Sequence, residues 1–195
     1  MVRIARVVSQ PARLARRGGA VCLRRPTPED QEEYHELRRA SRKFLAAWGM
    51  DTSPARDFRV FLDQGPGTSR ERWLVCATKG GAILGAVTIA AIRREPFESG
   101  VLGYWIGAPH ARQGFMTEAL ALAIRRAFTG LRLHRLEADV LPKNLASKRL
   151  LRRAGFTKEG LARGFVRVGG QWRDHERWAL LASDVKKSQR PQSRR

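Results

Sequence analysis

The chain has 195 residues, 43% of them hydrophobic, and carries a formal net charge of +20. This length is sufficient for one domain with a buried core, and no apolar run is long enough to span a bilayer. Length and composition therefore exclude a protein with transmembrane helices. They indicate a soluble globular protein, for which we expect no membrane partner.

The positive charge is concentrated at the two ends of the chain. Residues 1–20 contain five arginines and residues 186–195 contain five lysines or arginines, with no acidic residue in either segment. The two ends together account for +10, so the middle is itself basic, which favours an anionic ligand or partner. We expect residues 1–20 to form a basic disordered extension, 21–184 the folded domain, and 185–195 a basic disordered tail. An Arg-rich targeting helix and an RNA-binding tail are alternative interpretations of the first segment.

Cysteine and histidine usage provides no evidence for a metal site or a disulfide framework. Cys22 and Cys76 have neither metal-binding nor disulfide-type spacing, and the four histidines are scattered without a zinc pattern. A reducing compartment is the default for such a chain. We therefore expect a cytoplasmic protein without a bound metal.

The first third of the chain predicts one strand followed by helices. Residues 21–25 favour a strand, and Thr27 and Pro28 form a typical helix start with acidic residues in the first turn. The helical pattern that follows continues to Trp48, and a second short helix is expected over 54–63.

Six further strands and two further helices are expected in the rest of the chain. The strands are 72–78, 82–93, 100–107, 134–141, 156–168 and 171–182, and the helices begin at Gly114 and Asn144. Helices interleave with these strands, and hairpins are expected at both ends of the chain. The expected fold is therefore α/β, with a mixed, mostly antiparallel sheet of about seven strands.

The stretch from Gly103 to Glu118 predicts a strand, a tight loop and a helix in direct succession. Residues 104–106 favour a strand, Pro109 interrupts it, and Gly114 opens the helix. Such a turn aims backbone N–H groups and the positive end of the helix dipole at one point. That point suits a phosphate group.

Three segments together resemble one enzyme superfamily. They are residues 103–118, residues 134–156 with the core Leu-Pro-Lys-Asn-Leu-Ala-Ser, and the ending Gly-Gly-Gln-Trp-Arg-Asp-His-Glu at 169–176. In order and spacing they resemble the GNAT-superfamily N-acetyltransferases, and most closely the RimJ/RimL type, which acetylates the N-terminal amine of ribosomal proteins. The resemblance covers about residues 21–182. It implies a GNAT fold with helices on both faces of the sheet, splayed fourth and fifth strands, and acetyl-CoA as the acetyl donor.

The resemblance assigns a set of residues to acetyl-CoA. It implies that the pyrophosphate binds backbone amides of the loop and first helical turn: Arg112, Gln113, Gly114, Phe115, Met116 and Thr117. Ala111 and Met116 depart from the superfamily pattern at its first and last positions, so the cradle must depend on backbone amides rather than side chains. The pantetheine arm is expected between the splayed strands, where the Ile106 amide would polarise the thioester and hold the oxyanion.

Acetyl transfer also requires a base that removes a proton from the acceptor amine. The resemblance implies Glu137 on the fifth strand for this role. Asp139 lies on the same face of that strand and is an alternative that could act through water. The competing interpretation is that Glu137 forms an ion pair with an arginine such as Arg135 or Arg163.

The helix after the fifth strand carries the expected acid. The resemblance gives Asn144 a hydrogen bond to pantetheine and gives Ser147 contact with the sulfur as general acid. The alternative is that Asn144 is simply an N-cap with Ser147 in the first turn, and both can hold together. Many relatives use a tyrosine one turn later, where this chain has Leu151. A base that some relatives carry on the sixth strand corresponds to Val166 here.

Four residues are candidates for the acceptor pocket or, alternatively, for the core: Tyr104, Trp105, Trp172 and His175. Three functions follow as hypotheses. The first is acetylation of a protein N-terminus and the second is acetylation of a small amine, a choice that the loops 47–64 and 93–99 should decide. The third is a non-catalytic, ribosome- or RNA-associated protein with this fold. A monomer or a dimer fits each of them.

Overall fold

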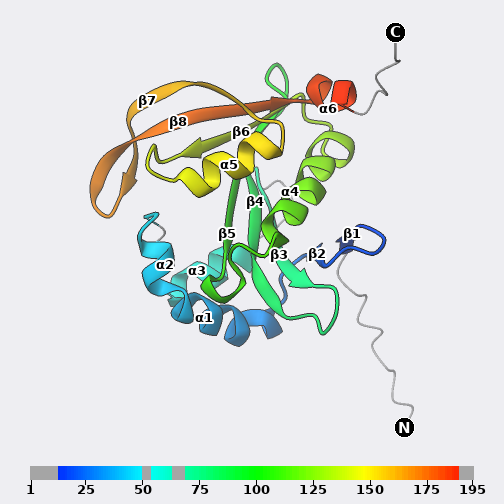
Figure 1. Ribbon diagram of the computed structural model, residues 1–195, viewed down its shortest axis with the longest axis vertical. Coiled ribbons are helices and arrows are strands. Elements are labelled where there is room, and N and C mark those ends of the chain that lie inside the picture. Colours follow the sequence, from blue (N-terminus) through cyan, green and yellow to red (C-terminus); the bar gives the residue numbers. More distant parts are fainter. Residues whose placement is uncertain (1–12, 50–53, 63–68, 189–195) are drawn as a thin grey trace.

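The computed structural model describes residues 13–49, 54–62 and 69–188 (Figure 1). In these residues eight strands form one sheet in the order β1-β2-β3-β4-β5-β6-β8-β7. The strands are β1 (Arg13–Ala15), β2 (Val21–Arg24), β3 (Glu71–Ala77), β4 (Ile83–Arg93), β5 (Ser99–Ile106), β6 (Arg135–Val140), β7 (Thr157–Val168) and β8 (Gln171–Leu181). All pairings are antiparallel except the one between β5 and β6. The expected α/β fold with a mixed, mostly antiparallel sheet is confirmed.

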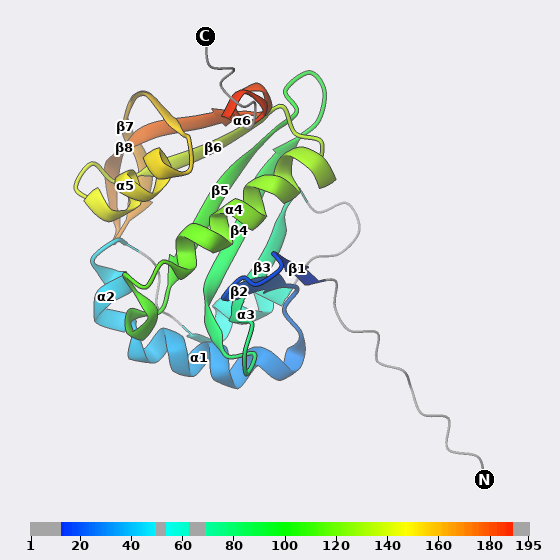
Figure 2. The ribbon, with the colours of Figure 1, turned by 45° about the vertical axis from the view of Figure 1, so that its right-hand side comes forward.

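Helices cover both faces of the sheet. They are η1 (Pro28–Asp30), α1 (Gln31–Ala40), α2 (Arg42–Ala46), α3 (Pro54–Leu62), η2 (Ala108–His110), α4 (Phe115–Arg125), η3 (Arg126–Gly130), α5 (Leu145–Arg153) and α6 (Ala182–Ser188). Figure 2 shows α4 and α5 over one face, with α1 and α3 on the other side. None of the helices in the described residues is both long and apolar enough to cross a lipid bilayer.

Alternating strand residues divide the core into two parts. Leu120 and Ile124 of α4 and Leu151 of α5 pack on one face of the sheet. Tyr34 of α1 and Phe58 of α3 pack on the other, together with aromatic and aliphatic residues of β2 to β5. The period-two pattern of the strands thus supplies both faces with apolar side chains.

The folded part of the chain begins before residue 21, the expected start of the domain. β1 was expected to belong to a disordered extension, but Arg13–Ala15 pairs with Cys22–Arg24 of β2. The turn between the two strands is anchored to α4, where Glu118 Oε2 accepts a hydrogen bond from the Ala20 amide at 3.1 Å. A three-residue edge strand carries almost no pattern of its own, so only these contacts define it. Residues 1–12 of the expected extension lie outside the described residues.

Two helices also differ from expectation. The helix expected from Pro28 to Trp48 is interrupted at Ser41, whose side chain accepts a hydrogen bond from the Ala108 amide at 2.8 Å. At the other end, α6 continues to Ser188, four residues into the expected tail. Residues 189–195 lie outside the described part of the chain.

A partly buried ion pair lies at the start of α1. Arg24 of β2 donates two hydrogen bonds to Asp30, at 2.7 and 2.6 Å, and the Thr27 amide donates a third at 2.8 Å. Burial alone would raise the pKa of Asp30, but these hydrogen bonds outweigh it and lower the pKa. A carboxylate with a lowered pKa stabilises the fold above its ordinary pKa, and this contribution is lost as the pH falls.

The substitution Asp30→Asn should therefore lower the free energy of unfolding by about 1–2 kcal/mol at pH 7. The difference from wild type should shrink as the pH falls through about 3.9, the ordinary pKa of aspartate. Urea unfolding at a series of pH values between 7 and 3 measures it. The exposed Glu36 of α1, changed to Gln, is the control. A pH-independent difference would contradict the assigned role of the Asp30 charge.

Candidate active site

The sheet opens between β5 and β6, which pair in parallel. β5 and β6 pair from Ser99–Val101 to Arg135–Glu137, and no pairing between them continues past Val101 in the described residues. Figure 1 shows β6 turning away from β5 to join β8 and β7. The expected splay of the fourth and fifth predicted strands, here β5 and β6, is thus present.

The free edge of β5 presents backbone amides to this opening. The Gly107 amide donates to the Leu84 carbonyl of β4 at 2.8 Å. Because successive residues of a strand direct their N–H groups to opposite edges, the Ile106 amide faces the opening. Geometry thus makes this amide available to a carbonyl oxygen placed between the strands.

The loop before α4 has a left-handed turn. Arg112 has φ 63° and Gly114, the N-cap residue of α4, has φ 84°. The amides of residues 112–116 donate to no backbone carbonyl in the described chain, whereas Thr117 and Glu118 both bond to the Gly114 carbonyl. The Gln113 side chain braces the loop through a 2.8 Å hydrogen bond to the Pro109 carbonyl. Free amides at the positive end of a helix are suited to an anion such as phosphate.

The structure explains why glycine stands at position 114. An added Cβ there would meet no atom within 4 Å, so space inside the protein does not require a glycine. The left-handed φ does require one, since other residues adopt it at a cost. Met116 is buried in the core, which leaves its backbone amide but not its side chain for a ligand.

Across the opening, α5 begins with a side-chain cap. Asn144 Oδ1 accepts from the Ser147 amide at 3.0 Å, so the N-cap interpretation of Asn144 is correct. This cap fixes the first turn of α5 and with it the Ser147 side chain. The Ser147 hydroxyl lies 2.6 Å from the hydroxyl of Tyr104 on β5. Leu151, one turn later, is fully buried in the core and has no access to the opening.

A carboxylate cluster lies on the opposite face of the sheet. Glu137 is only 8% exposed and accepts hydrogen bonds from Arg135 at 2.8 Å and from Arg177 at 3.0 Å. Arg93 approaches it to 3.8 Å. The expected pairing with Arg135 is therefore present, whereas Arg163 is not among the partners of Glu137 in the described residues.

Asp139 and His175 extend this cluster. Arg177 Nε lies 2.7 Å from Asp139 Oδ1. Burial raises the pKa of Asp139, although the nearby Arg177 opposes the shift. His175 is buried on β8, with its Nδ1 3.1 Å from the Arg173 carbonyl, and its ring contacts Phe165.

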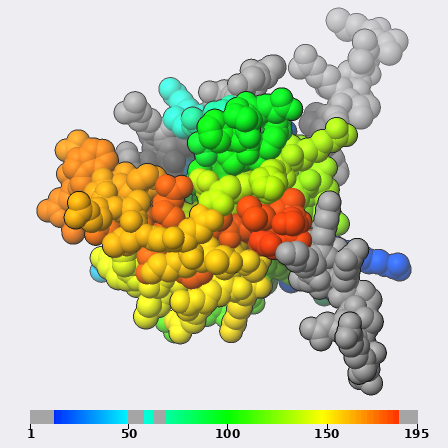
Figure 3. Space-filling model, turned by 90° about the horizontal axis from the view of Figure 1, so that it is seen from above, coloured from blue at the N-terminus to red at the C-terminus, as the bar shows by residue number. Residues whose placement is uncertain are grey.

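The remaining candidates for the acceptor pocket lie in different parts of the structure. Trp105 is buried in the core against Tyr34, beneath the Arg38 guanidinium, which lies 5.2 Å from its ring centroid. Trp172 is 67% exposed near the tip of the β7–β8 hairpin, which projects at the edge of the molecule (Figure 3). Tyr104 lies on the α5 side of the sheet rather than with the carboxylates. Of the expected loops, 50–53 and 63–64 lie outside the described residues.

Sequence reasoning missed two features of the site. One is the set of arginines, Arg93 and Arg177, that contact Glu137 from other strands. The other is the contact between Tyr104 and Ser147. Period-two spacing from Ile106 places Tyr104 at the same edge of β5, but no local pattern identifies its partner on α5.

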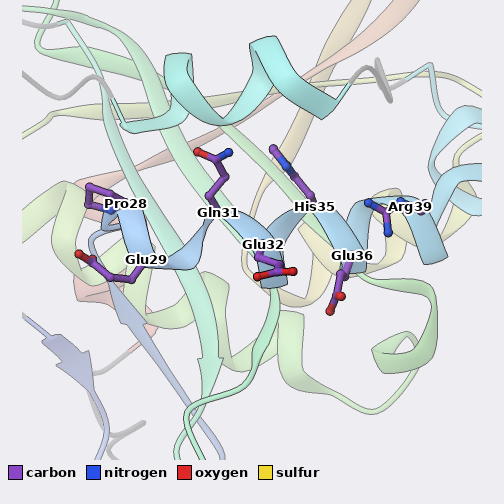
Figure 4. Close-up of a pocket in the computed structure, with 7 residues that line it drawn as sticks. All are labelled: Pro28, Glu29, Gln31, Glu32, His35, Glu36 and Arg39. Atoms are coloured by element: carbon purple, nitrogen blue, oxygen red, sulfur yellow. The ribbon is translucent and has the colours of Figure 1, made fainter.

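A shallow pocket of about 500 Å³ runs along α1, away from this opening. Its lining residues are Pro28, Glu29, Gln31, Glu32, His35, Glu36 and Arg39. Figure 4 shows the Glu32 and Glu36 carboxylates on one side of the helix and His35 on the other. These residues belong to η1 and α1 alone and not to the strands and helices that border the opening, so we assign the pocket no part in the site.

Most of the chain matches one protein family. A family model described as an acetyltransferase (GNAT) domain matches residues 20–157, more than two thirds of the chain. The chain belongs to the GNAT acetyltransferase family. Its opening between β5 and β6, its α4 turn and its α5 start are thus the parts of a GNAT acetyltransferase domain.

Curated relatives match part of this GNAT domain. The [Ribosomal protein uS5]-alanine N-acetyltransferase of Escherichia coli (strain K12) is 40% identical over 102 residues, which is 52% of this chain and 53% of that protein. The "Probable N-acetyltransferase YjcK" of Bacillus subtilis (strain 168) is 43% identical over 102 residues, 52% of this chain and 56% of that protein. The chain thus spans about half the length of these curated relatives.

A solved structure matches most of the chain. Mycobacterium smegmatis RimJ in complex with CoA-disulfide superimposes with a TM-score of 0.76 and 28% identity, covering 90% of this chain and 88% of that one. The RimJ-like GNAT fold expected from the sequence is therefore confirmed.

The α4 turn can be tested with a pair of matched glycines. Gly114 has φ 84° and Gly81, in the β3–β4 turn, has φ 75°, and a Cβ at either position meets open space. Gly114→Trp and Gly81→Trp should therefore cost similar strain, about 1–2 kcal/mol each. Only Gly114→Trp should weaken acetyl-CoA binding, by tenfold or more, in calorimetric titration. Equal affinities in the two variants would contradict the placement of the phosphates at the α4 turn.

Proposed function

We propose that this GNAT domain transfers the acetyl group of acetyl-CoA to the N-terminal amine of a protein, such as a ribosomal protein. The observation that carries the proposal is that two sets of free backbone amides lie at one opening. The amides before α4 suit an anion, and the Ile106 amide of β5 suits a carbonyl oxygen. The uS5-alanine acetyltransferase of E. coli supports the acceptor class. Two free, buried cysteines fit action in a reducing cytoplasm.

On the donor side, each group has one task. The amides of residues 112–116 hold the pyrophosphate at the N-terminus of α4. The free edge of β5 aligns the pantetheine arm, and Asn144 offers its amide nitrogen while its oxygen caps α5. The Ile106 amide stabilises the oxyanion that forms when the amine attacks the thioester.

On the acceptor side, a carboxylate takes the proton of the amine. Glu137 lies at the last paired position before β5 and β6 separate, opposite Val101. This position places it at the base of the opening, on the face away from α4 and α5. Asp139, two residues further along β6, is the alternative base through water.

The charges around these carboxylates favour an acceptor with one amine. Arg93, Arg135 and Arg177 contact the carboxylates of Glu137 and Asp139, so each of these two carboxylates already has an arginine partner. A polyamine carries several ammonium groups and needs carboxylates that lack such partners. A peptide N-terminus brings a single amine, and the neighbouring Phe165 offers an apolar surface beside it.

A thiol-release assay tests the proposal. The full chain is mixed with acetyl-CoA and with peptides that begin with Ala, Ser, Met or Leu, and with spermidine as a small polycationic amine. We expect thiol release with peptides and little with spermidine. Thiol release with spermidine but not with the peptides would instead support acetylation of a small molecule. Absence of release with any amine, together with absence of thermal stabilisation by acetyl-CoA, would overturn the enzymatic proposal in favour of a binding protein.

A further inference from the structure

One hydrogen bond joins the two sides of the opening. Tyr104 of β5 and Ser147 of α5 are 43 residues apart in sequence, yet their hydroxyl oxygens lie 2.6 Å apart. Among the described residues this is the side-chain hydrogen bond that connects β5 to α5. It lies beyond Val101, where the two strands have already separated.

Both partners are held in place by independent contacts. Tyr104 packs against the core beneath α4, and its side chain shares the face of Ile106, two residues later. Ser147 is fixed because its amide donates to Asn144. The hydroxyl pair therefore belongs to the rigid frame of the opening rather than to a mobile loop.

The acidities of the two hydroxyls favour one direction for this hydrogen bond. Burial raises the pKa of Tyr104 to about 12, although the bond to Ser147 opposes the shift, so the phenol keeps its proton at neutral pH. A phenol is a stronger acid than an alcohol, which favours Tyr104 as donor and Ser147 as acceptor. A serine oxygen that accepts one hydrogen bond still has its own proton to donate elsewhere.

We propose that Tyr104 is a positioning residue that turns the Ser147 hydroxyl proton toward the sulfur of the thioester. The inference rests on the proposed acetyl transfer. In that reaction the amine nitrogen bonds to the acetyl carbon, the carbon–sulfur bond breaks, and its electron pair goes to sulfur. The ammonium proton goes to the carboxylate base, and the departing thiolate accepts the Ser147 hydrogen bond before it takes a proton from water.

The expected effect of Tyr104→Phe is on the chemical step. This variant keeps the ring and its packing but removes the donor, so kcat should fall about tenfold while the KM for acetyl-CoA changes less than twofold. Ser147→Ala should show the same pattern or a larger loss of kcat. The double variant should be no slower than Ser147→Ala, because both changes remove one shared interaction. Ser147→Thr, which retains a hydroxyl, should recover most of the activity.

A second acetyl donor distinguishes a positioning role of Tyr104 from a general loss of activity. The selenoester of CoA has a leaving group that is a much stronger acid than a thiol, so it departs without help from a hydrogen-bond donor. Tyr104→Phe should be slow on the thioester and close to wild type on the selenoester. Equal loss on both donors, or an unchanged kcat on the thioester, would overturn the role of Tyr104. Absence of turnover by the wild-type chain would instead overturn the proposed function itself.

Discussion

Replacement of Gly85 by alanine should lower kcat at least tenfold, although Gly85 lies on β4 and outside every motif of the donor site. Gly85 is the register partner of Ile106. A Cβ at this position would lie 2.3 Å from the Trp105 carbonyl oxygen and 3.0 Å from the Ile106 Cα. These are backbone atoms, so β5 must move as a unit to relieve the contact.

Such a movement displaces the amide that is expected to hold the oxyanion. A misplacement of about 1 Å in a reacting geometry can cost about 10²-fold in rate, and overpacking of this kind costs about 1–3 kcal/mol of stability. Steady-state kinetics, measured well below the melting temperature of the variant, tests the effect. Gly160→Ala in β7 is a matched control, because a Cβ there meets no atom within 4 Å. A folded Gly85→Ala enzyme with wild-type kcat would contradict the importance of the β5 backbone position.

The substitution Glu137→Gln should reduce both stability and activity. The buried carboxylate accepts hydrogen bonds from Arg135 and Arg177, and the substitution removes one of the two carboxylates that each arginine contacts, leaving Glu159 for Arg135 and Asp139 for Arg177. The side chains of these arginines are 26% and 33% exposed, so solvent screens part of the loss. We therefore expect a decrease of about 1–3 kcal/mol in the free energy of unfolding, less than the roughly 3–5 kcal/mol typical of a broken, fully buried pair.

The kinetic effect of Glu137→Gln should be larger than this loss of stability. Removal of a general base typically costs about 10²- to 10⁴-fold in kcat. Glu159→Gln provides the control, because Glu159 also pairs with Arg135 but is 44% exposed at its side chain and lies at the periphery. The control should retain wild-type kcat in the thiol-release assay. A destabilised Glu137→Gln variant with normal kcat would assign Glu137 a structural role and leave Asp139 as the base.

Local sequence predicted the elements of the fold well. Seven of the eight strands in the described residues follow from runs of β-branched and aromatic residues bounded by glycine or proline. The missed strand, β1, has three residues and exists because it pairs with β2. The break at Ser41, whose side chain accepts a hydrogen bond from the distant Ala108 amide, was also missed. Strand and helix propensity are local, whereas edge pairing and helix breaks of this kind depend on tertiary contacts.

In the site, too, local features were predictable from the sequence and contacts between distant residues were not. The turn at Arg112 to Gly114 and the Asn144 cap each depend on a few consecutive residues, so local sequence was sufficient to predict them, whereas the direction of the Ile106 amide depends on the register of β5 against β4. The contact between Tyr104 and Ser147 and the pairing of Glu137 with Arg177 join residues 43 and 40 positions apart. Only the packing of α5 and the register of β8 against β6 bring these partners together, because a sequence pattern specifies which face a side chain occupies but not which distant side chain it meets there.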